Sequence, residues 1–321
     1  MQSTSGNIKD VEAEIAEVLS GQPSILFEAA SYLISSGGKR LRPRLLLAFN
    51  RMFGGDRESA VRAAASIEML HNFTLIHDDI MDKDETRHGV PTTHVKFGDA
   101  IAILAGDVLQ SESQMEMARA AQVLPSQKAR HLLGVHAHIS TEIAKGQTMD
   151  MQFEGMRYEA FTPKLYFSMI RLKTAILFSH SCWVGAYLAG AQARSAKAAA
   201  AFGMDLGMAF QMADDILGLV GDPSVTGKPV GSDVRNGKKT MPILLAVRNA
   251  RGQEREKLLS LLEKRDPSAT DIIVKAGGID ATRDLMERYR LRAESQLSSL
   301  PDNGAREELK ELLYSSLVRE K

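Results

Sequence analysis

The chain has 321 residues, 44% of them hydrophobic and 25% charged, a composition typical of a globular protein and unlike that of disordered or collagen-like chains. Forty basic and forty acidic side chains cancel, so the sequence carries no overall charge suited to nucleic acid or to an anionic membrane surface. The single cysteine, Cys182, excludes an internal disulfide, and the N-terminus lacks a secretory signal, which together predict a cytoplasmic location.

Helical spacing of apolar residues runs along nearly the whole chain, from "IKDVEAEIAEVL" to "KLLSLLEK" and "REELKELLYSSLV". No stretch alternates over the length of a strand, so the sequence predicts an all-α fold of about a dozen helices. The uncharged stretch 175–191 is shorter than the roughly 20 residues that a membrane span needs, and we expect a buried core helix there.

Glycine and proline interrupt the helical pattern at intervals. The interruptions fall at Gly37-Gly38, Gly54-Gly55, Gly89 to Pro91, Pro125, Pro163, Gly221 to Gly237, Pro267 and Pro301. None of them is long or biased enough to be an interdomain linker, so a single domain over residues 1–321 is expected.

A basic segment, "SSGGKRLRPRL", places Lys39, Arg40, Arg42 and Arg44 directly after a glycine pair. Pro43 helps to define a helix start there. Such a cluster can bind a diphosphate, although a solvated basic loop has the same appearance. Other basic candidates beside polar or glycine-rich turns are Arg87, Lys173, Lys228 and Lys238.

The first aspartate segment, "EMLHNFTLIHDDIMD", contains Asp78, Asp79 and Asp82. If it is one helix, Asp78 and Asp82 share a face about 6 Å apart along the axis. Like charges so placed repel each other, and the apolar residues before them raise that cost, so a cation is the natural partner. Oxygen ligands alone favour Mg²⁺ or Mn²⁺. A solvated helix end is the alternative for this segment taken by itself.

A second acidic pair, Asp214 and Asp215, lies in "GMAFQMADDILGLVGD", with Gln211 one turn earlier. Two such helices could hold several divalent ions between them. Because Mg²⁺ keeps waters and is usually completed by substrate phosphates, the two segments together predict a diphosphate site.

The sequence resembles the trans-isoprenyl diphosphate synthases, or polyprenyl synthetases, over nearly its whole length. Motifs in family order carry the resemblance: "GGKRLRP", "LIHDDIMDKDETRHG", "GQTMD", "KTA", "FQMADD" and "GKPVGSDVRNGKKT". The resemblance implies a helical bundle around a deep central cavity, with the two aspartate motifs facing each other across its mouth, in a homodimer. It also implies head-to-tail condensation of isopentenyl diphosphate with dimethylallyl, geranyl or farnesyl diphosphate through an allylic carbocation.

The resemblance also assigns roles to individual residues. Asp78, Asp82 and Asp214 match the ligands of about three Mg²⁺ ions, with Asp79 and Asp215 supporting them. Positions that match contacts to isopentenyl diphosphate are Lys39, Arg42 and His71. Positions that match contacts to the allylic diphosphate are Arg87, Lys173, Thr174, Gln211, Lys228 and Lys238.

Two positions depart from the family pattern. Gly218 stands where a third aspartate of the second motif is usual. Asp222 is not expected to substitute for it, because eight residues of helix would carry it about 12 Å along the axis from Asp214 and the helix is expected to end at Gly221 to Pro223. His88 stands where an arginine is common, and a neutral imidazole lacks the fixed charge and bidentate reach of that arginine. We therefore expect weaker isopentenyl diphosphate binding, or a preference for lower pH.

Phe73 bears on product length, because it precedes Asp78 by five residues, about 7.5 Å along a helix, with the small Thr74 beside it. Bulk at this depth can form a floor for the growing tail, and the surrounding sequence is most similar to archaeal-type geranylgeranyl diphosphate synthases. We expect a geranylgeranyl product, with farnesyl or longer chains as alternatives and a purely structural phenylalanine as the simpler interpretation.

Three other classes fit parts of the pattern. "HDD" with His71 and His77 suggests an HD-type phosphohydrolase, but leaves "FQMADD" unexplained. A class I terpene cyclase shares the first aspartate motif but not a second double aspartate. A non-catalytic subunit of a heteromeric synthase is the third alternative, although such subunits tend to lose their aspartates.

Overall fold

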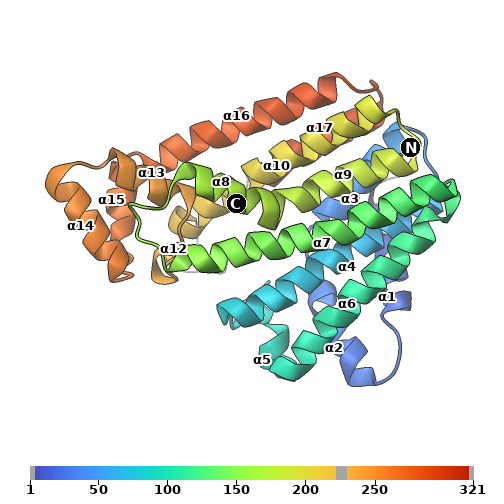
Figure 1. Ribbon diagram of the computed structural model, residues 1–321, viewed down its shortest axis with the longest axis horizontal. Helices are drawn as coiled ribbons and strands as arrows, with labels where there is room; N and C mark the ends of the chain where they lie inside the picture. Colours follow the sequence, from blue (N-terminus) through green and yellow to red (C-terminus); the bar gives the residue numbers. More distant parts are fainter. Residues whose placement is uncertain (1–3, 222–229, 318–321) are drawn as a thin grey trace. The chain divides into compact units, whose positions relative to one another are not determined.

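The computed structural model describes residues 4–221 and 230–317. These residues are almost entirely helical (Figure 1), which confirms the all-α prediction. Within the described ranges the only strands are β1 (Thr86–Arg87) and β2 (Val90–Pro91), a short antiparallel hairpin that pairs Thr86 with Pro91 and Arg87 with Val90.

The helices follow the breaks expected from glycine and proline. In chain order they are α1 (Thr4–Val18), α2 (Ser24–Ser35), α3 (Leu41–Met52), α4 (Arg57–Asp82), α5 (Thr93–Phe97), α6 (Asp99–Ala120), η1 (Ala121–Val123), α7 (Ser126–Glu154), α8 (Pro163–Ile170), η2 (Arg171–Ala175), α9 (Ile176–Leu188), α10 (Ala193–Val220), α12 (Ser232–Arg235), α13 (Met241–Asn249), α14 (Gly252–Glu263), α15 (Ala269–Lys275), α16 (Gly278–Ser298) and α17 (Gly304–Leu317). The turn η2 is a π-helix.

The chain divides into two compact units. Unit 1 contains Met1–Thr141, Leu177–Gly203 and Gln296–Leu312. Unit 2 contains Glu142–Ile176, Met204–Ser295 and Leu313–Lys321. The expectation of a single domain over residues 1–321 stays a prediction.

Unit 1 is built around α4, which packs along α6 and against α3 and α1 (Figure 1). The helix begins where the Asp56 side chain accepts a hydrogen bond from the Ser59 N–H at 2.7 Å, which satisfies a backbone donor left over at the helix start. It ends at Lys83, whose left-handed conformation stops the helix. The long apolar face between these ends positions the first aspartate segment at the C-terminal end of α4.

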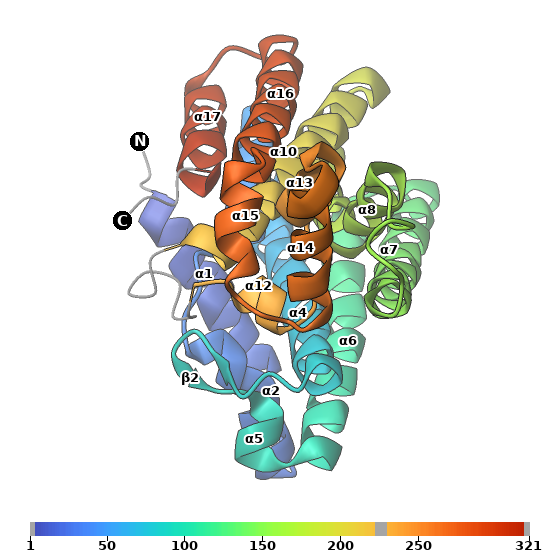
Figure 2. The ribbon, with the colours of Figure 1, turned by 90° about the vertical axis from the view of Figure 1, so that its left-hand side faces the viewer.

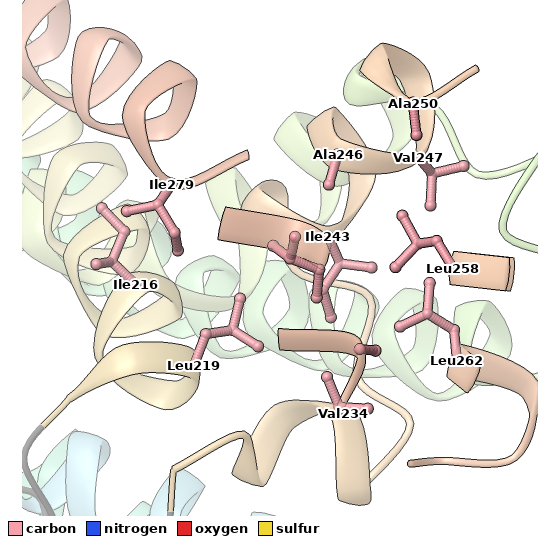
Figure 3. Close-up of a cluster of buried hydrophobic side chains, with 12 residues drawn as sticks. Ile216, Leu219, Val234, Ile243, Ala246, Val247, Ala250, Leu258, Leu262 and Ile279 are labelled. Carbon is pink, nitrogen blue, oxygen red and sulfur yellow. The ribbon is translucent and has the colours of Figure 1, made fainter. Parts of the chain in front are cut away.

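Unit 2 has a second core, where α13, α14 and α15 pack against one another (Figure 2). Figure 3 shows how Ile216 and Leu219 of α10 meet Val234 of α12 and Ile243 of α13 in this cluster. These side chains are at most 8% exposed, so their burial fixes the last turns of α10 against α12.

The uncharged stretch 175–191 contains the whole of α9, and its Phe178 and Cys182 are fully buried. No helix among the described residues is long and apolar enough to cross a membrane. The expectation of a core helix is therefore confirmed.

Candidate active site

The basic segment of unit 1 contains two arginines that the protein itself holds in place. Arg40, in a left-handed conformation before α3, forms a buried ion pair with Glu68 at 3.1 Å. Arg42 is 9% exposed and its guanidinium lies 4.2 Å from the centre of the Phe178 ring, a cation–π contact. Lys39 is exposed. Arg42 is thus oriented by packing, while Lys39 projects into solvent.

His71 lies among these positive charges. Burial, followed by Arg42, Arg87 and His88, holds the pKa of His71 well below its usual value. Burial, and then the neighbouring cations, disfavour the protonated imidazole, and an anion that binds beside it would favour protonation. The structure therefore brings the predicted residues Arg42, His71, Arg87 and His88 into one electrostatic group.

The first aspartate segment has two outward carboxylates and one inward carboxylate. Asp78 and Asp82 are partly exposed, whereas Asp79 is 1% exposed. Arg87 Nε donates to Asp79 Oδ1 at 2.8 Å, and Arg87 Nη2 donates to the same oxygen at 2.5 Å. Burial raises the pKa of Asp79, and the Arg87 hydrogen bonds oppose that rise. Asp79 thus orients Arg87, while Asp78 and Asp82 face away from the interior.

His88 occupies the turn of the hairpin that follows α4, with φ of 51°. A Cβ on Gly38 would lie 4.0 Å from His88 Cε1, so His88 is close to the glycine pair of the basic segment. Burial, then Arg87 and Arg40, lowers the pKa of His88. The imidazole is therefore mainly uncharged at neutral pH.

Phe73 and Thr74 lie on α4, five and four residues before Asp78 and therefore more than one helical turn from it. The Phe73 ring is 4.8 Å from the ring of His77 in an edge-to-face contact, and His77 Nε2 is 3.1 Å from the carbonyl oxygen of Ile103 on α6. The Thr74 hydroxyl donates to the His71 carbonyl at 2.7 Å. The Phe73 side chain therefore contacts a histidine anchored to α6.

In unit 2 the second aspartate pair divides in the same way. Asp214 is partly exposed, whereas Asp215 is 3% exposed. Asp215 accepts hydrogen bonds from the Tyr166 hydroxyl at 2.5 Å, from Gln211 Nε2 at 3.1 Å and from the Met241 backbone N–H at 3.0 Å. Burial, then the charge of Asp233, raises the pKa of Asp215 to about 7.

The same network reaches the "KTA" segment, which forms the π-helical turn η2. The Thr174 hydroxyl donates to Gln211 Oε1 at 2.9 Å, and Lys173 Nζ donates to Asp150 Oδ2 at 2.6 Å. A Cβ on Gly146 would lie 2.3 Å from the Lys173 backbone nitrogen, so only glycine allows α7 to approach this turn so closely. The "GQTMD" and "KTA" motifs are therefore packed together.

The structure shows less about the other predicted residues, which lie at or near α12. Lys238 is partly buried and follows α12, with its backbone N–H bonded to the Asp233 carbonyl at 2.9 Å. Lys228 and Asp222 lie outside the described residues.

Four residues of this region were not predicted as site residues: Glu68, Asp150, Tyr166 and Gln147. Their partners lie 23 to 49 residues away in the chain for the three with printed contacts, a separation that periodicity does not reveal. Gln147 is 7% exposed, and neither atom of its amide has a hydrogen-bond partner among the described residues. Its place beside Gly146 in "GQTMD" was the only available signal.

A sequence profile of the polyprenyl synthetase family matches residues 23–276. The chain belongs to the polyprenyl synthetase family. Members of this family are prenyltransferases, so this chain is a prenyltransferase. Membership sets aside the HD-type hydrolase and terpene cyclase alternatives.

Similar proteins agree with this assignment over almost the full length of this polyprenyl synthetase. It is 40% identical over 298 residues to a geranylgeranyl diphosphate synthase of Sulfolobus acidocaldarius, with 91% of this chain and 90% of that protein covered. It is 42% identical over 310 residues to a geranylfarnesyl diphosphate synthase of Aeropyrum pernix, covering 94% and 96%. The crystal structure of geranylgeranyl pyrophosphate synthetase from Pyrococcus horikoshii Ot3 superposes with a TM-score of 0.92 at 36% identity, covering 99% and 97%.

Proposed function

We propose that this polyprenyl synthetase condenses isopentenyl diphosphate head-to-tail with dimethylallyl, geranyl and farnesyl diphosphates and releases geranylgeranyl diphosphate. Phe73 is the observation that carries the product assignment, because it supplies an aromatic ring on α4 five residues before Asp78. The similarity to proteins named for geranylgeranyl diphosphate supports it.

The carboxylates suit Mg²⁺, with Mn²⁺ as a substitute. Asp78, Asp82 and Asp214 are partly exposed oxygen donors, the type that hard divalent cations prefer. Asp79 and Asp215 already accept several hydrogen bonds from the protein, which suits supporting roles. When bound, the metal ions would neutralise charge on the diphosphate leaving group. We propose Asp78, Asp82 and Asp214 as the direct ligands.

The basic groups divide between the two substrates. Lys39, Arg42, His71 and His88 are proposed to bind isopentenyl diphosphate, and Arg87, Lys173, Thr174, Gln211, Lys228 and Lys238 the allylic diphosphate. Arg42 and Arg87 are held by Phe178 and Asp79, and Thr174 is held by Gln211, so these groups need little rearrangement to meet an anion. Fixed donors of this kind stabilise charge that develops as a bond breaks.

The reaction follows from that arrangement. The allylic carbon–oxygen bond breaks and the electron pair leaves with the diphosphate. The double bond of isopentenyl diphosphate then attacks the allylic carbocation, and loss of a proton to the departing diphosphate completes one five-carbon extension. The protein contributes mainly positioning and electrostatics.

Product sizing tests the function directly. Purified protein is incubated with Mg²⁺, labelled isopentenyl diphosphate and, separately, each of the three allylic starters. We expect a geranylgeranyl product from each, whereas a farnesyl or a longer product would correct the length. If none of the three starters leads to incorporation of label, the result would instead support a non-catalytic subunit of a heteromeric synthase.

Replacing Phe73 tests whether its ring limits the length of the growing prenyl tail. Phe73→Ala should lengthen the product, because removing the ring opens space on α4 below Asp78. Phe97→Ala is the matched control: Phe97 packs on Tyr32, with ring centres 5.5 Å apart, and should leave the product unchanged. An unaltered product ladder for Phe73→Ala would reject the floor assignment.

A homodimer and a cytoplasmic location complete the proposal. On α6, Leu104 and Met115 are half-exposed, and Val108 lies between them on the same face, an i, i+4, i+11 spacing. Such an apolar stripe is suited to association with a second copy of the chain. Sedimentation velocity should give a dimer for the wild type and a weakened dimer for Leu104→Asp.

A further inference from the structure

Arg40 differs from the lysine that precedes it in the basic segment. It is 8% exposed, whereas Lys39 is exposed. The Arg40 backbone has φ of 48° and ψ of 37°, a left-handed conformation that is uncommon for a residue other than glycine. Such a conformation persists only where the surrounding structure holds it. The contacts of the Arg40 side chain supply that support.

All three nitrogens of the Arg40 guanidinium are bound to the protein. Nη1 donates to Glu68 Oε1 at 3.1 Å and to the Gly37 carbonyl at 2.7 Å, and Nη2 donates to the Ile34 carbonyl. Nε donates to Glu12 Oε1 at 3.2 Å. A guanidinium engaged in this way has little donor capacity left for a substrate diphosphate. Arg40 therefore acts on the protein around it.

These contacts join three helices beside the basic segment. Ile34 lies in the last turn of α2, where a carbonyl needs a donor and a positive charge is favoured. Glu68 lies within α4 and is 4% exposed, and its Oε1 also accepts from Asn72 Nδ2 at 3.4 Å. Glu12 lies on α1, with its side chain 47% exposed. One guanidinium thus fixes the segment to α1, α2 and α4.

The same contacts lie on both sides of Lys39. Arg40 follows Lys39 directly, and its Nη1 binds the carbonyl of Gly37, two residues before Lys39. Gly37 and Gly38 have φ of 129° and 124°, so the loop is built from residues with wide conformational freedom. Arg42 is held separately by its cation–π contact with α9. The Arg40 contacts therefore set where Lys39 lies relative to Arg42.

The charge of Glu68 also acts on Arg42. Burial raises the pKa of Glu68, and the charges of Arg40 and then Arg42 are the largest effects that oppose this rise. The Glu68 carboxylate therefore faces both the arginine that fixes the loop and the arginine proposed to bind a diphosphate.

We propose that Arg40 is a positioning residue for isopentenyl diphosphate, held by Glu12 and Glu68 so that Lys39 and Arg42 are presented together to the diphosphate. The inference rests on the proposed function of the basic segment. Without these contacts the glycine loop would have to be ordered when the substrate binds, which lowers affinity for that substrate. The inference also makes α1 part of the binding site, because Glu12 acts through Arg40.

Conservative substitutions of the two ends of this contact test the proposal. Arg40→Lys keeps the positive charge but loses the planar group that binds several partners at once. Glu12→Gln removes a half-exposed charge, which leaves the core of α1 intact. The matched controls are Asp10→Asn and Arg57→Lys, because Asp10 lies on α1, has a 40% exposed side chain and pairs with Arg57 of α4.

The readout is steady-state kinetics in which isopentenyl diphosphate and geranyl diphosphate are varied separately. Arg40→Lys should raise the KM for isopentenyl diphosphate by about tenfold or more. Glu12→Gln should raise it by about threefold, because a half-exposed ion pair contributes less. The KM for geranyl diphosphate and kcat should stay within about twofold of the wild type, and both controls should match the wild type throughout.

A wild-type KM for isopentenyl diphosphate in Arg40→Lys would overturn the proposal, as would equal rises in the KM values of both substrates. A wild-type KM in Glu12→Gln alone would remove α1 from the site. If Arg40→Lys does not fold, the comparison of Glu12→Gln with Asp10→Asn decides. A lower melting temperature with an unchanged ratio of the two KM values would show that Arg40 is structural only.

Lys39→Ala separates this inference from the proposed function. If it raises the KM for isopentenyl diphosphate while Arg40→Lys does not, the role of Arg40 is wrong and the assignment of the segment stands. If Lys39→Ala and Arg42→Ala both leave that KM unchanged, the proposed function of the segment fails and the inference fails with it.

Discussion

The two aspartate segments both contain an Asp-Asp pair, but the protein stabilises the buried carboxylate of each pair with different hydrogen-bond donors. In unit 1 Asp79 is matched by the charged guanidinium of Arg87, at 2.5 to 3.0 Å. In unit 2 Asp215 is matched by neutral donors, a tyrosine hydroxyl, an amide and a backbone N–H. Consecutive helical positions point about 100° apart, so each double aspartate has one buried carboxylate and one that is partly exposed. We therefore expect substitutions of the inward residue to affect mainly stability and substitutions of the outward residue to affect mainly activity.

The largest expected effect concerns the outward carboxylates. Asp78→Ala and Asp214→Ala should each lower kcat/KM by about 10³-fold or more, because several kcal/mol of metal-derived stabilisation is lost. Melting temperatures should change little, since both side chains are partly exposed. Steady-state kinetics with geranyl diphosphate measures the loss, and Asp284→Asn, at an exposed aspartate of α16, is the control. If Asp78→Ala or Asp214→Ala destabilised the protein as much as substitution of the buried Asp79 or Asp215, the distinction between outward and inward carboxylates would be wrong.

Breaking the charged pair should have the next largest effect. Asp79→Asn leaves the Arg87 guanidinium beside a neutral amide, and removing one partner of a buried pair costs about 3–5 kcal/mol. Because Arg87 is 24% exposed, we expect about 2–3 kcal/mol. Urea denaturation gives the change in the free energy of unfolding. Asp84→Asn, whose carboxylate lies 3.9 Å from Arg87, should cost much less.

The neutral hydrogen-bond donors around Asp215 should lose less stability on substitution than the Asp79–Arg87 pair. Tyr166→Phe removes one of three donors to Asp215, and we expect a loss of about 1–2 kcal/mol in the free energy of unfolding. Asp215→Asn keeps an oxygen that can accept from the Met241 N–H. In the same urea titration it should lower the free energy of unfolding by less than Asp79→Asn. Equal costs at the two positions would show that the type of donor does not matter. Tyr158→Phe, at a tyrosine that is not fully buried, is the control.

The smallest expected effect concerns His88. Its pKa is lowered by burial and by Arg87 and Arg40, so it is mainly neutral at pH 7 and gains a proton only as the pH falls. The KM for isopentenyl diphosphate should therefore fall as the pH is lowered toward 6. His88→Arg should lower that KM by about threefold to tenfold at pH 7 and flatten its pH dependence. An unchanged KM in His88→Arg would remove His88 from the substrate contacts.

Much of the site could be found in the sequence because it rests on local patterns. Asp78 and Asp82 are four residues apart in a periodic apolar segment, so their common face follows from helix geometry alone. The breaks at Gly37-Gly38 and Pro163 marked real helix boundaries for the same reason. The short hairpin around His88 was not foreseen, since two-residue strands leave no alternating pattern.

The partners that decide what each buried polar group does come from distant parts of the chain. Tyr166 reaches Asp215 across 49 residues, and Glu68 reaches Arg40 across 28. Sequence pattern presents Arg40 only as one member of a basic cluster, because spacing along the chain says nothing about a side chain that arrives from another element.

The sequence by itself determined the all-α fold, the family and the positions of the two aspartate segments, since helical periodicity and motif spacing are local properties of the chain. Only the tertiary structure decided which aspartate of each pair is buried, what neutralises it, and that the Arg40 guanidinium is already bound by other parts of the protein. Those outcomes depend on packing and hydrogen bonds between residues far apart in sequence, where burial makes each polar partner energetically necessary.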